Sequence, residues 1–426
     1  LSGKMSKPVT FLLSKVKGDR YIWLVVFVLS VVSLLAVYSS TETLAYKSAG
    51  GNTEYYLIKH FIIMVFGILL MYLSHLIPYK YYSRIAQILL WLSVPALIYT
   101  MTIAPEVNDA SRWITLPVIN LTFQTSDLAR FALIMYTARV LSKKQEKIES
   151  FKEAFIPVIL PIAIICALIL PENLSTASVL FFSCIVLMFV GRVKFKYIML
   201  TVGAGIVLLG IIIGLSYLLP DIGRLGTWNS RVESFINGGT EDDSFQTDQA
   251  KIAIAKGMVF GVGPGNSTQK DFLPYPYADF IYATIIEEYG MIGGIFIIFL
   301  YLVFLYRCIK IVAKAPSSFG ALLAVGLGLV LTIQAFVNMG VAVHLLPTTG
   351  LTLPLVSMGG TSLWFTSLSI GIILSVSREI EMKEEEEINQ AEGMEELAEN
   401  VMEEDEIVLE DIAVDAISTT NKKTKA

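Results

Sequence analysis

Carboxyl groups inside or beside apolar segments are the residues of this sequence best suited to do chemistry. Asp279 stands in the segment Y-P-Y-A-D-F-I-Y, between a proline-rich loop and a long apolar run. An aspartate there can cap the first turn of a helix, and composition alone favours that role. The same position also puts a carboxylate at the depth of a lipid headgroup, where acid–base chemistry on that headgroup is open to it.

Two more acidic sites lie in apolar runs. Glu287 and Glu288 lie one to two turns into the run that follows Asp279. A charge near the bilayer centre costs roughly 2.5–3.5 kcal/mol, so at least one of them should face the protein interior. Asp127 and Arg130 begin another run three residues apart, on one helical face. This spacing favours a self-neutralising interfacial ion pair over the alternative, the floor of a polar cavity.

The elements that must position these residues are membrane-spanning helices. The sequence is 54% hydrophobic and only 16% charged, and its mean hydropathy is +0.65. Water does not tolerate so much exposed apolar surface, whereas lipid solvates it. A span needs about 20 apolar residues. We therefore predict an all-α polytopic membrane protein with about ten transmembrane helices. The candidate spans are 21–40, 56–77, 83–104, 125–141, 154–170, 175–191, 197–219, 278–306, 318–340 and 358–376.

Basic residues in alternate short loops orient these spans. They precede the first span and follow the second, fourth, sixth and eighth. Both termini are therefore predicted in the cytoplasm, and the long loop 220–278 before the eighth span lies outside. The first apolar run lacks a small-residue cleavage site, so we expect it to remain a span. A cytoplasmic segment 1–20 precedes the transmembrane domain 21–378. An acidic tail, 379–426, follows as a disordered segment or a helix that forms with a partner.

Metal and nucleotide chemistry find little support. The cysteines (Cys166, Cys184 and Cys308) lie in or at the ends of apolar runs and have neither metal-ligand nor disulfide spacing. The glycine-rich run 261–267 (G-V-G-P-G-N-S) follows no strand and lacks the spacing of a dinucleotide fingerprint, and no Walker-type loop occurs. We predict no nucleotide cofactor and no nucleic-acid partner.

Three segments together resemble one protein family. Residues 261–290 (G-V-G-P-G-N-S-T-Q-K, then D-F-L-P-Y-P-Y-A-D-F-I-Y-A-T-I-I-E-E-Y-G) resemble the signature loop of the SEDS proteins (shape, elongation, division and sporulation). Residues 338–362 (N-M-G-V-A-V-H-L-L-P-T-T-G-L-T-L-P-L-V-S-M-G-G-T-S) resemble a second signature. R-W-I with F-Q-T-S-D-L-A-R, within 112–130, resembles a third. The wording G-N-S-x-Q-K is more similar to the division branch of the family than to its elongation branch.

The resemblance implies a peptidoglycan glycosyltransferase of the bacterial cytoplasmic membrane, acting at the division septum. It implies lipid II as the substrate and, as partners, a cognate class B penicillin-binding transpeptidase and other division proteins. It also implies that Asp279 is the catalytic carboxylate and that Trp113 belongs to the R-W-I motif. The family's S-E-x-x-K motif reads S-D-L-A-R here, which carries its roles to Ser126, Asp127 and Arg130.

Two departures from the family pattern accompany that resemblance. The turn Q-P-D-x-G-T reads P-E-N-L-S-T over 171–176, so Asn173 replaces an aspartate. The family's H-T-D reads Tyr277, Ala278, Asp279, which changes the neighbours of the catalytic carboxylate and keeps the carboxylate itself.

Glycan polymerisation from an α-linked donor to a β-linked product inverts the anomeric centre in one displacement. Inversion needs a general base opposite the leaving group, and we expect Asp279 to be that base. The leaving pyrophosphate needs positive charge from basic side chains or from a divalent cation, Mg²⁺ or Mn²⁺. The candidate cations, in falling order, are Arg112, Arg130, Arg231 and Lys270.

Several uncharged residues are expected to shape the substrate cavity. They are Gln269, Ser357, Gly359 and Gly360. Trp113 either binds substrate or anchors the chain at the membrane interface, as aromatic-belt residues do.

Two other functions stay open at this point. A transporter that flips the lipid-linked precursor would need polar groups along a path through the bilayer, whereas the polar signatures crowd the outer loops. A non-catalytic scaffold for division proteins would need neither Asp279 nor the loop glycines.

Overall fold

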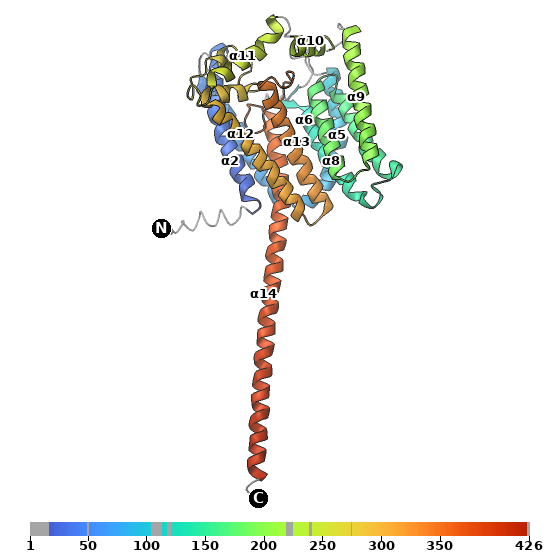
Figure 1. The fold of residues 1–426 in the computed structure, drawn as a ribbon, viewed down its shortest axis with the longest axis vertical. Helices are drawn as coiled ribbons and strands as arrows, with labels where there is room; N and C mark the ends of the chain where they lie inside the picture. The colour runs from blue at the N-terminus through green and yellow to red at the C-terminus, as the bar shows by residue number, and fades with distance from the viewer. Residues whose placement is uncertain are drawn as a thin grey trace. The chain divides into compact units, whose positions relative to one another are not determined.

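A computed structural model describes residues 17–48, 51–103, 113–116, 121–218, 225–237, 241–273 and 275–423. The chain divides into two units, Leu1–Ser377 and Arg378–Ala426. The first unit is a helical bundle (Figure 1).

The described helices follow one another along the chain. They are α2 (Arg20–Ser40), α3 (Glu42–Ser48), α4 (Thr53–Leu76), α5 (Tyr82–Ile103), α6 (Thr125–Lys143), α7 (Ile156–Ile169), α8 (Leu174–Val190), α9 (Phe195–Leu218), α10 (Leu225–Asn237), α11 (Glu241–Gly257), α12 (Ile281–Lys314), α13 (Ser318–Ala342) and α14 (Thr361–Lys423). Single turns occur at Tyr79–Tyr81, Gln145–Lys147, Phe151–Phe155 and Gln269–Asp271.

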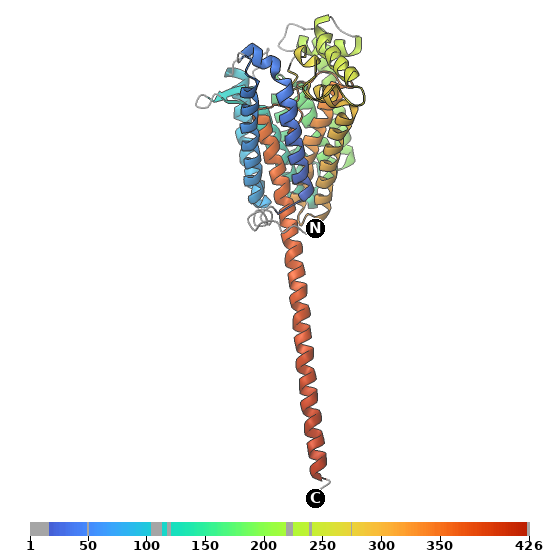
Figure 2. The same ribbon diagram turned by 90° about the vertical axis from the view of Figure 1, so that its left-hand side faces the viewer.

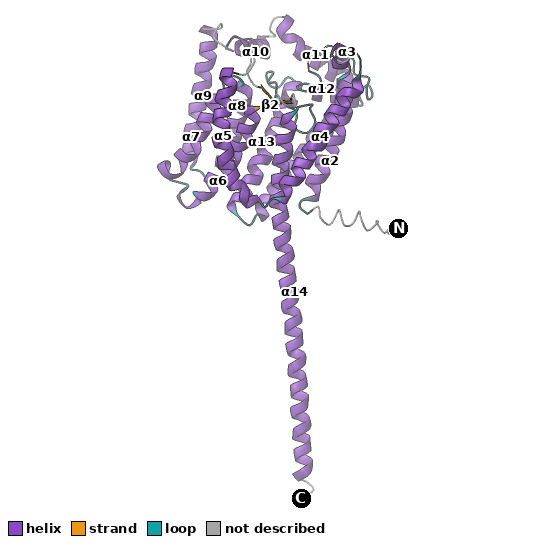
Figure 3. Ribbon diagram, turned by 180° about the vertical axis from the view of Figure 1, so that it is seen from behind, coloured by secondary structure: helices purple, strands orange, loops and turns teal. Residues whose placement is uncertain are grey.

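One small hairpin interrupts the helices. Strand β1 (Trp113–Leu116) pairs antiparallel with β2 (Leu121–Gln124), and Trp113 stands opposite Gln124. Figure 3 shows β2 toward the end of the bundle that carries α10 and α11. Because α6 begins directly after β2, the hairpin fixes where α6 starts.

Each of the ten predicted spans coincides with a helix of this structure. Eight helices in the described ranges are long and apolar enough to cross a membrane. Of the other two, α8 is a shorter apolar helix and α6 carries the charged residues Asp127 and Arg130. The protein is therefore a multi-pass helical membrane protein, and the number of ten crossings stays a prediction.

Helix α13 lies at the centre of the bundle and packs against α6, α8 and α12. Small residues make this close approach possible, as in other membrane bundles. A Cβ built on Gly328 would lie 2.7 Å from Cys308 Sγ of α12. Cys308 and Cys184 are buried and carry no disulfide, so they pack as small apolar side chains, as predicted.

Helix α12 is broken at Gly290, whose φ of 70° and ψ of −173° are not helical. In a continuous helix the amides of Met291 and Ile292 would bond within α12. Here they donate to Met258 O (2.9 Å) and Val259 O (3.4 Å) instead. A loop that follows α11 thus supplies the partners that the break removes.

The same loop also serves the carbonyls that the break frees. Val262 N donates to Glu287 O (2.9 Å) and Gly263 N donates to Glu288 O (3.0 Å). This contact is so close that a Cβ on Gly261 would lie 2.1 Å from Glu288 O. The glycine-rich run is therefore needed for backbone packing, because any side chain at Gly261 would collide with α12.

Helices α10 and α11 lie at one end of the bundle, as Figures 1 and 2 both show. They occupy about half of the long predicted extracytoplasmic loop 220–278. In the sequence, apolar residues recur at helical spacing over 249–259, which predicts a surface helix, and α11 covers that stretch as far as Gly257.

The second unit, from Arg378 on, is helical to Lys423 as part of α14. The structure has a helix over this acidic tail, and the choice between a disordered segment and a helix that forms with a partner stays a prediction. Consecutive glutamates at Glu384–Glu387 are exposed on it.

Candidate functional site

A cavity of about 230 Å³ lies at the end of the bundle that carries α10 and α11. Residues from α10, α11, α13, the start of α12 and the loop after α13 line it. They are Thr227, Ser230, Arg231, Ser234, Gln246, Asp279, Phe280, Val341, Thr348, Thr349, Gly350 and Leu351. The cavity thus brings together α10 and α11 of the long loop and the signature segments 261–290 and 338–362.

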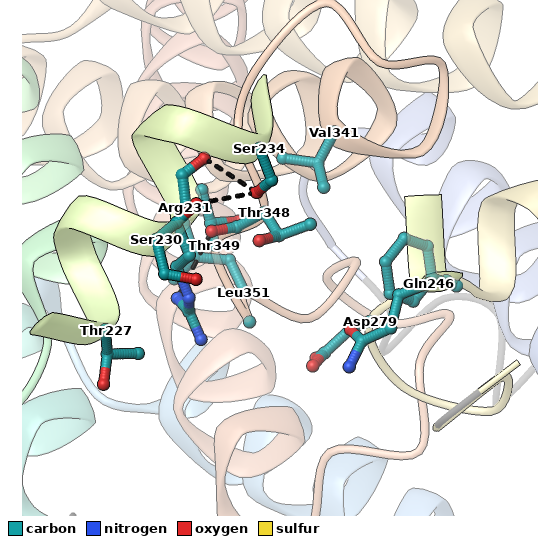
Figure 4. Close-up of a pocket in the computed structure, with 12 residues that line it drawn as sticks. Thr227, Ser230, Arg231, Ser234, Gln246, Asp279, Val341, Thr348, Thr349 and Leu351 are labelled. Atoms are coloured by element: carbon teal, nitrogen blue, oxygen red, sulfur yellow. Dashed lines mark hydrogen bonds between the residues drawn. The ribbon is translucent and has the colours of Figure 1, made fainter. Parts of the chain in front are cut away.

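Two of the residues predicted from the sequence, Asp279 and Arg231, line this cavity. Figure 4 shows Asp279 near the Gln246 side chain, with Arg231 entering from α10. Arg231 Nη1 also donates to Thr348 O (3.3 Å), which ties α10 to the loop after α13. The cavity therefore offers one carboxylate and one guanidinium, the charges that a proton acceptor and an anion-binding group require.

Helix α10 presents a polar face to the cavity. Thr227, Ser230, Arg231 and Ser234 recur at spacings of three and four residues, so they share one side of the helix. The Ser234 hydroxyl donates to Ser230 O (2.8 Å) in the preceding turn (Figure 4). Of these four residues, only Arg231 is predicted from the sequence, although this periodicity could have indicated the other three.

The backbone around Asp279 is fixed by residues of the second signature segment. Asn338 Nδ2 donates to Asp279 O (2.9 Å) and to Leu351 O (2.6 Å). The Ser357 hydroxyl donates to Ala278 O (2.6 Å). Ser357 is buried and does not line the cavity, so in this structure it positions the segment that carries Asp279. Its predicted role in shaping the substrate cavity stays a prediction.

Glycine at position 350 brings the opposite wall close to the Asp279 carboxylate. Gly350 has a φ of +64°, and a Cβ built there would lie 3.6 Å from Asp279 Oδ2. Tyr277 lies near the same charge. Burial first, and then the neighbouring Tyr275, Tyr56 and Asp279, raise the pKa of Tyr277 to about 12. Its hydroxyl therefore keeps its proton at neutral pH.

Glu287 is buried and holds the signature loop. Its carboxylate accepts hydrogen bonds from Ser267 Oγ (2.5 Å), Thr268 N (3.1 Å), Thr268 Oγ1 (3.3 Å) and Gln269 N (3.3 Å). Glu288 is also buried and accepts from Ser39 Oγ of α2. Both glutamates face the protein interior, as predicted for at least one of them, and neither lines the cavity.

Gln269 and Lys270 also lie outside the cavity lining. Gln269 is buried, and its amide contacts Glu287. The Lys270 ammonium pairs with Glu42 of α3 (2.7 Å) and donates to Gly265 O (3.1 Å). The structure thus places these two residues in the signature loop that Glu287 holds, and neither lines the cavity.

Asp127 and Arg130 form the predicted ion pair, with Arg130 Nη2 3.2 Å from Asp127 Oδ1. Each side chain is only 6% exposed, so the pair is buried within the protein. Its predicted level at the membrane interface stays a prediction. Arg130 also donates to Gln334 Oε1 of α13, and Gln334 Nε2 donates to Thr352 O (2.8 Å). The pair stands outside the cavity and connects α6 to the second signature segment.

The remaining predicted residues fall at other places. Arg112 lies outside the described residues, and Trp113 belongs to β1 with its side chain outside the description. Gly359 and Gly360 lie in the loop before α14, and neither lines the cavity. Within the described ranges, three or more His, Cys, Asp or Glu residues do not gather as a metal site.

The fold and the cavity together define a class: a multi-pass helical membrane protein with a charged cavity at one end of its bundle. Comparison with known proteins narrows this class. The profile of the cell cycle proteins FtsW, RodA and SpoVE matches residues 19–382. The chain therefore belongs to the FtsW/RodA/SpoVE family.

Curated relatives cover most of the chain. It is 33% identical over 372 residues to the probable peptidoglycan glycosyltransferase FtsW of Coxiella burnetii, covering 84% of this chain and 96% of that protein. It is 30% identical over 373 residues to the stage V sporulation protein E of Bacillus subtilis, covering 85% and 98%.

Solved structures share the fold. A chain of a peptidoglycan synthase complex that coordinates polymerization and crosslinking matches with a TM-score of 0.65 at 24% identity, covering 85% of this chain and 98% of that one. The rod shape determining protein RodA of Thermus thermophilus matches with a TM-score of 0.61 at 22% identity, covering 85% and 97%.

Proposed function

We propose that this protein polymerises lipid II into glycan strands during cell division. The proposal rests on membership of the FtsW/RodA/SpoVE family and on relatives named as peptidoglycan glycosyltransferases. The observation that carries it is the cavity in which Asp279 and Arg231 lie together, with the Asp279 backbone held by Asn338.

The reaction joins two lipid-linked disaccharides. The C4 hydroxyl oxygen of one GlcNAc attacks C1 of another precursor's MurNAc, and the bond from C1 to the pyrophosphate oxygen breaks with inversion. Asp279 accepts the proton of the attacking hydroxyl, and undecaprenyl pyrophosphate leaves. General-base catalysis of this kind contributes about 10²–10⁴-fold in rate.

The leaving group carries negative charge that the protein must stabilise. Arg231 is the cation that lines the cavity from α10, and its contact with Thr348 O keeps it beside the loop after α13. Planar guanidinium groups bind phosphate oxygens through two parallel hydrogen bonds. We assign the pyrophosphate to Arg231 because it lines the cavity together with Asp279, whereas Arg130 and Lys270 do not belong to that lining.

A divalent cation fits this cavity only together with the substrate. Mg²⁺ at phosphoryl sites typically takes one or two carboxylates and completes its shell with phosphates and water. Asp279 is the carboxylate among the lining residues, and Gln246 adds an amide oxygen. When bound, Mg²⁺ or Mn²⁺ would neutralise the pyrophosphate charge.

The proposed partners follow from the same family membership. A cognate class B transpeptidase would crosslink the strands that this chain makes, in line with the similar fold in a peptidoglycan synthase complex. Other division proteins would recruit the pair to the septum of the bacterial cytoplasmic membrane.

The test compares polymer made from lipid II by the native protein and by Asp279→Asn, each purified with the transpeptidase. Asp248→Asn, an exposed carboxylate of α11, is the matched control. Polymer from the native and control proteins, lost in Asp279→Asn at equal folding and partner binding, supports glycosyltransfer. Undiminished polymer from Asp279→Asn refutes its role as the base. If the native protein gives no polymer in a complex whose transpeptidase is active, the flippase or scaffold function replaces the proposal.

A further inference from the structure

An exposed apolar ridge lies between α11 and the glycine-rich run. It consists of Met258, Val259, Phe260 and Val262. Met258 is 74% exposed and Phe260 is 81% exposed. Four apolar side chains in one short stretch, all exposed, are not expected in contact with water.

The backbone contacts of the ridge fix its depth in the membrane. Met291 N donates to Met258 O and Ile292 N donates to Val259 O, so the ridge lies level with those two residues of α12. Arg307, which follows Met291 by 16 residues on the same helix, pairs with Asp19 at the start of α2. At 1.5 Å per residue, Met291 lies about 24 Å from Arg307 along the helix axis.

That distance lies within the hydrocarbon core. The core is about 30 Å thick, and charged groups such as Arg307 and Asp19 mark its boundary on one side. Met291 therefore lies about 6 Å short of the opposite boundary. The ridge, at the same level, falls inside the hydrocarbon on the side where α10 and α11 lie.

The ridge is continuous with a surface of α12 that faces lipid. Met291, Ile292 and Ile295 of α12 are all exposed and apolar, as a membrane-spanning helix presents them to acyl chains. Lys256, just before the ridge, is exposed and donates to Thr268 Oγ1 (2.6 Å). A lysine at that place is suited to meet lipid phosphates while the ridge meets the chains.

We infer that the ridge inserts into the leaflet on the α11 side and contacts lipid acyl chains, with Lys256 at the level of the headgroups. The membrane then holds the loop from one side while Glu287 and the broken part of α12 hold it from the other. The inference rests on the membrane topology alone and does not depend on the proposed reaction.

Depth-dependent fluorescence quenching tests this insertion. The full chain, carrying Phe260→Cys labelled with bimane, is placed in nanodiscs whose phosphatidylcholine and phosphatidylglycerol carry bromine on the acyl chains. Ile295→Cys on α12 is the lipid-facing control, and Asp248→Cys on α11 is the exposed polar control. The unsubstituted chain gives the background from its native cysteines. Met258→Cys repeats the measurement at a second ridge position.

Insertion predicts that brominated lipid removes emission at Phe260→Cys and Met258→Cys to an extent comparable to Ile295→Cys, and leaves Asp248→Cys unchanged. Quenching at both ridge positions by aqueous iodide, with none by brominated lipid, overturns the inference. An apolar emission spectrum that neither quencher alters also overturns it, because a protein surface, from a second copy or from other parts of the chain, would then cover the ridge.

Discussion

Replacing Glu287 by glutamine separates a structural role of this carboxylate from a chemical one. Glu287 is buried, and four donor groups of the loop 267–269 point at its two oxygens. In Glu287→Gln the two backbone amides, Thr268 N and Gln269 N, keep an acceptor oxygen but lose its charge. We therefore expect the loop to open more often while the helix around it stays folded.

The magnitude follows from the two amide bonds. A hydrogen bond to a charged group contributes about 1.5–3 kcal/mol and one between neutral groups about 0.5–1.5, so each amide loses about 1 kcal/mol. Together they lose about 2 kcal/mol, which corresponds to about a 30-fold change in an equilibrium constant. Relief from burying the charge offsets part of this loss, so about 30-fold is the upper end.

Hydrogen exchange of the backbone amides measures the effect directly. Protection of the Thr268 and Gln269 amides should fall by up to about 30-fold in Glu287→Gln, because local opening sets their exchange rate. Glu54→Gln, an exposed carboxylate at the start of α4, should leave their exchange unchanged.

Polymer formation in the same variant completes the test. If Glu287 has only a structural role, the rate of polymer formation should fall by no larger a factor than the protection of the Thr268 and Gln269 amides. If activity instead drops by about 10²–10⁴-fold while amide protection stays native, Glu287 acts as an acid or base and our account of it fails.

Three further substitutions test other parts of the structure. Arg130→Met leaves Asp127 buried without its cation and should cost about 3–5 kcal/mol, visible as a lower thermal midpoint, whereas the double variant with Asp127→Leu should recover much of that loss. Asn338→Leu removes the donor shared by Asp279 O and Leu351 O, two neutral hydrogen bonds that contribute about 1–2 kcal/mol. It should slow polymerisation by about 10-fold and lower the thermal midpoint by no more than a few degrees. Burial first, and then the charge of Lys251, lower the pKa of His344 below its usual 6.5, against the opposing effect of Asp248. As the pH falls below 6.5, the unfolded chain therefore binds a proton at His344 more readily than the folded chain, and the free energy of unfolding decreases. His344→Asn, which tolerates the φ of 59°, should show a smaller loss of thermal midpoint over that range, and an equal loss would contradict this assignment.

The helices were largely predictable from the sequence, because lipid imposes a simple requirement on them. A span must be apolar over about 20 residues, so the runs that became α2, α9 and α13 stand out by composition alone. Asp279 and Arg231 were also predicted, the first from its place before an apolar run and from the family resemblance, the second as a loop cation.

Pairings between distant segments were not predictable in the same way. Arg130 and Gln334 are 204 positions apart, and Lys270 and Glu42 are 228 apart, so no local pattern connects them. The sequence therefore shows Arg130 and Lys270 as candidate cations for substrate and gives no sign of the protein partner that each has. Their predicted roles toward substrate stay predictions. A cation in a loop or at a helix end shows its charge in the sequence but not the carboxylate that it meets.

The break in α12 explains why the signature loop combines glycines with glutamates. At Gly290 two amides and two carbonyls leave the helix and bond to the loop backbone, an arrangement that no side chain can supply. Such backbone pairing requires very close approach, which a Cβ at Gly257 (2.0 Å from Ile286 O) or at Gly290 (2.2 Å from Val259 O) would prevent. It fixes the loop at Met258–Gly263, and the Glu287 carboxylate then fixes the next turn at Ser267–Gln269. Asp279 lies between this clamped loop and the first half of α12, so the glycines and Glu287 act on the cavity through the position of the carboxylate and not through contact with substrate.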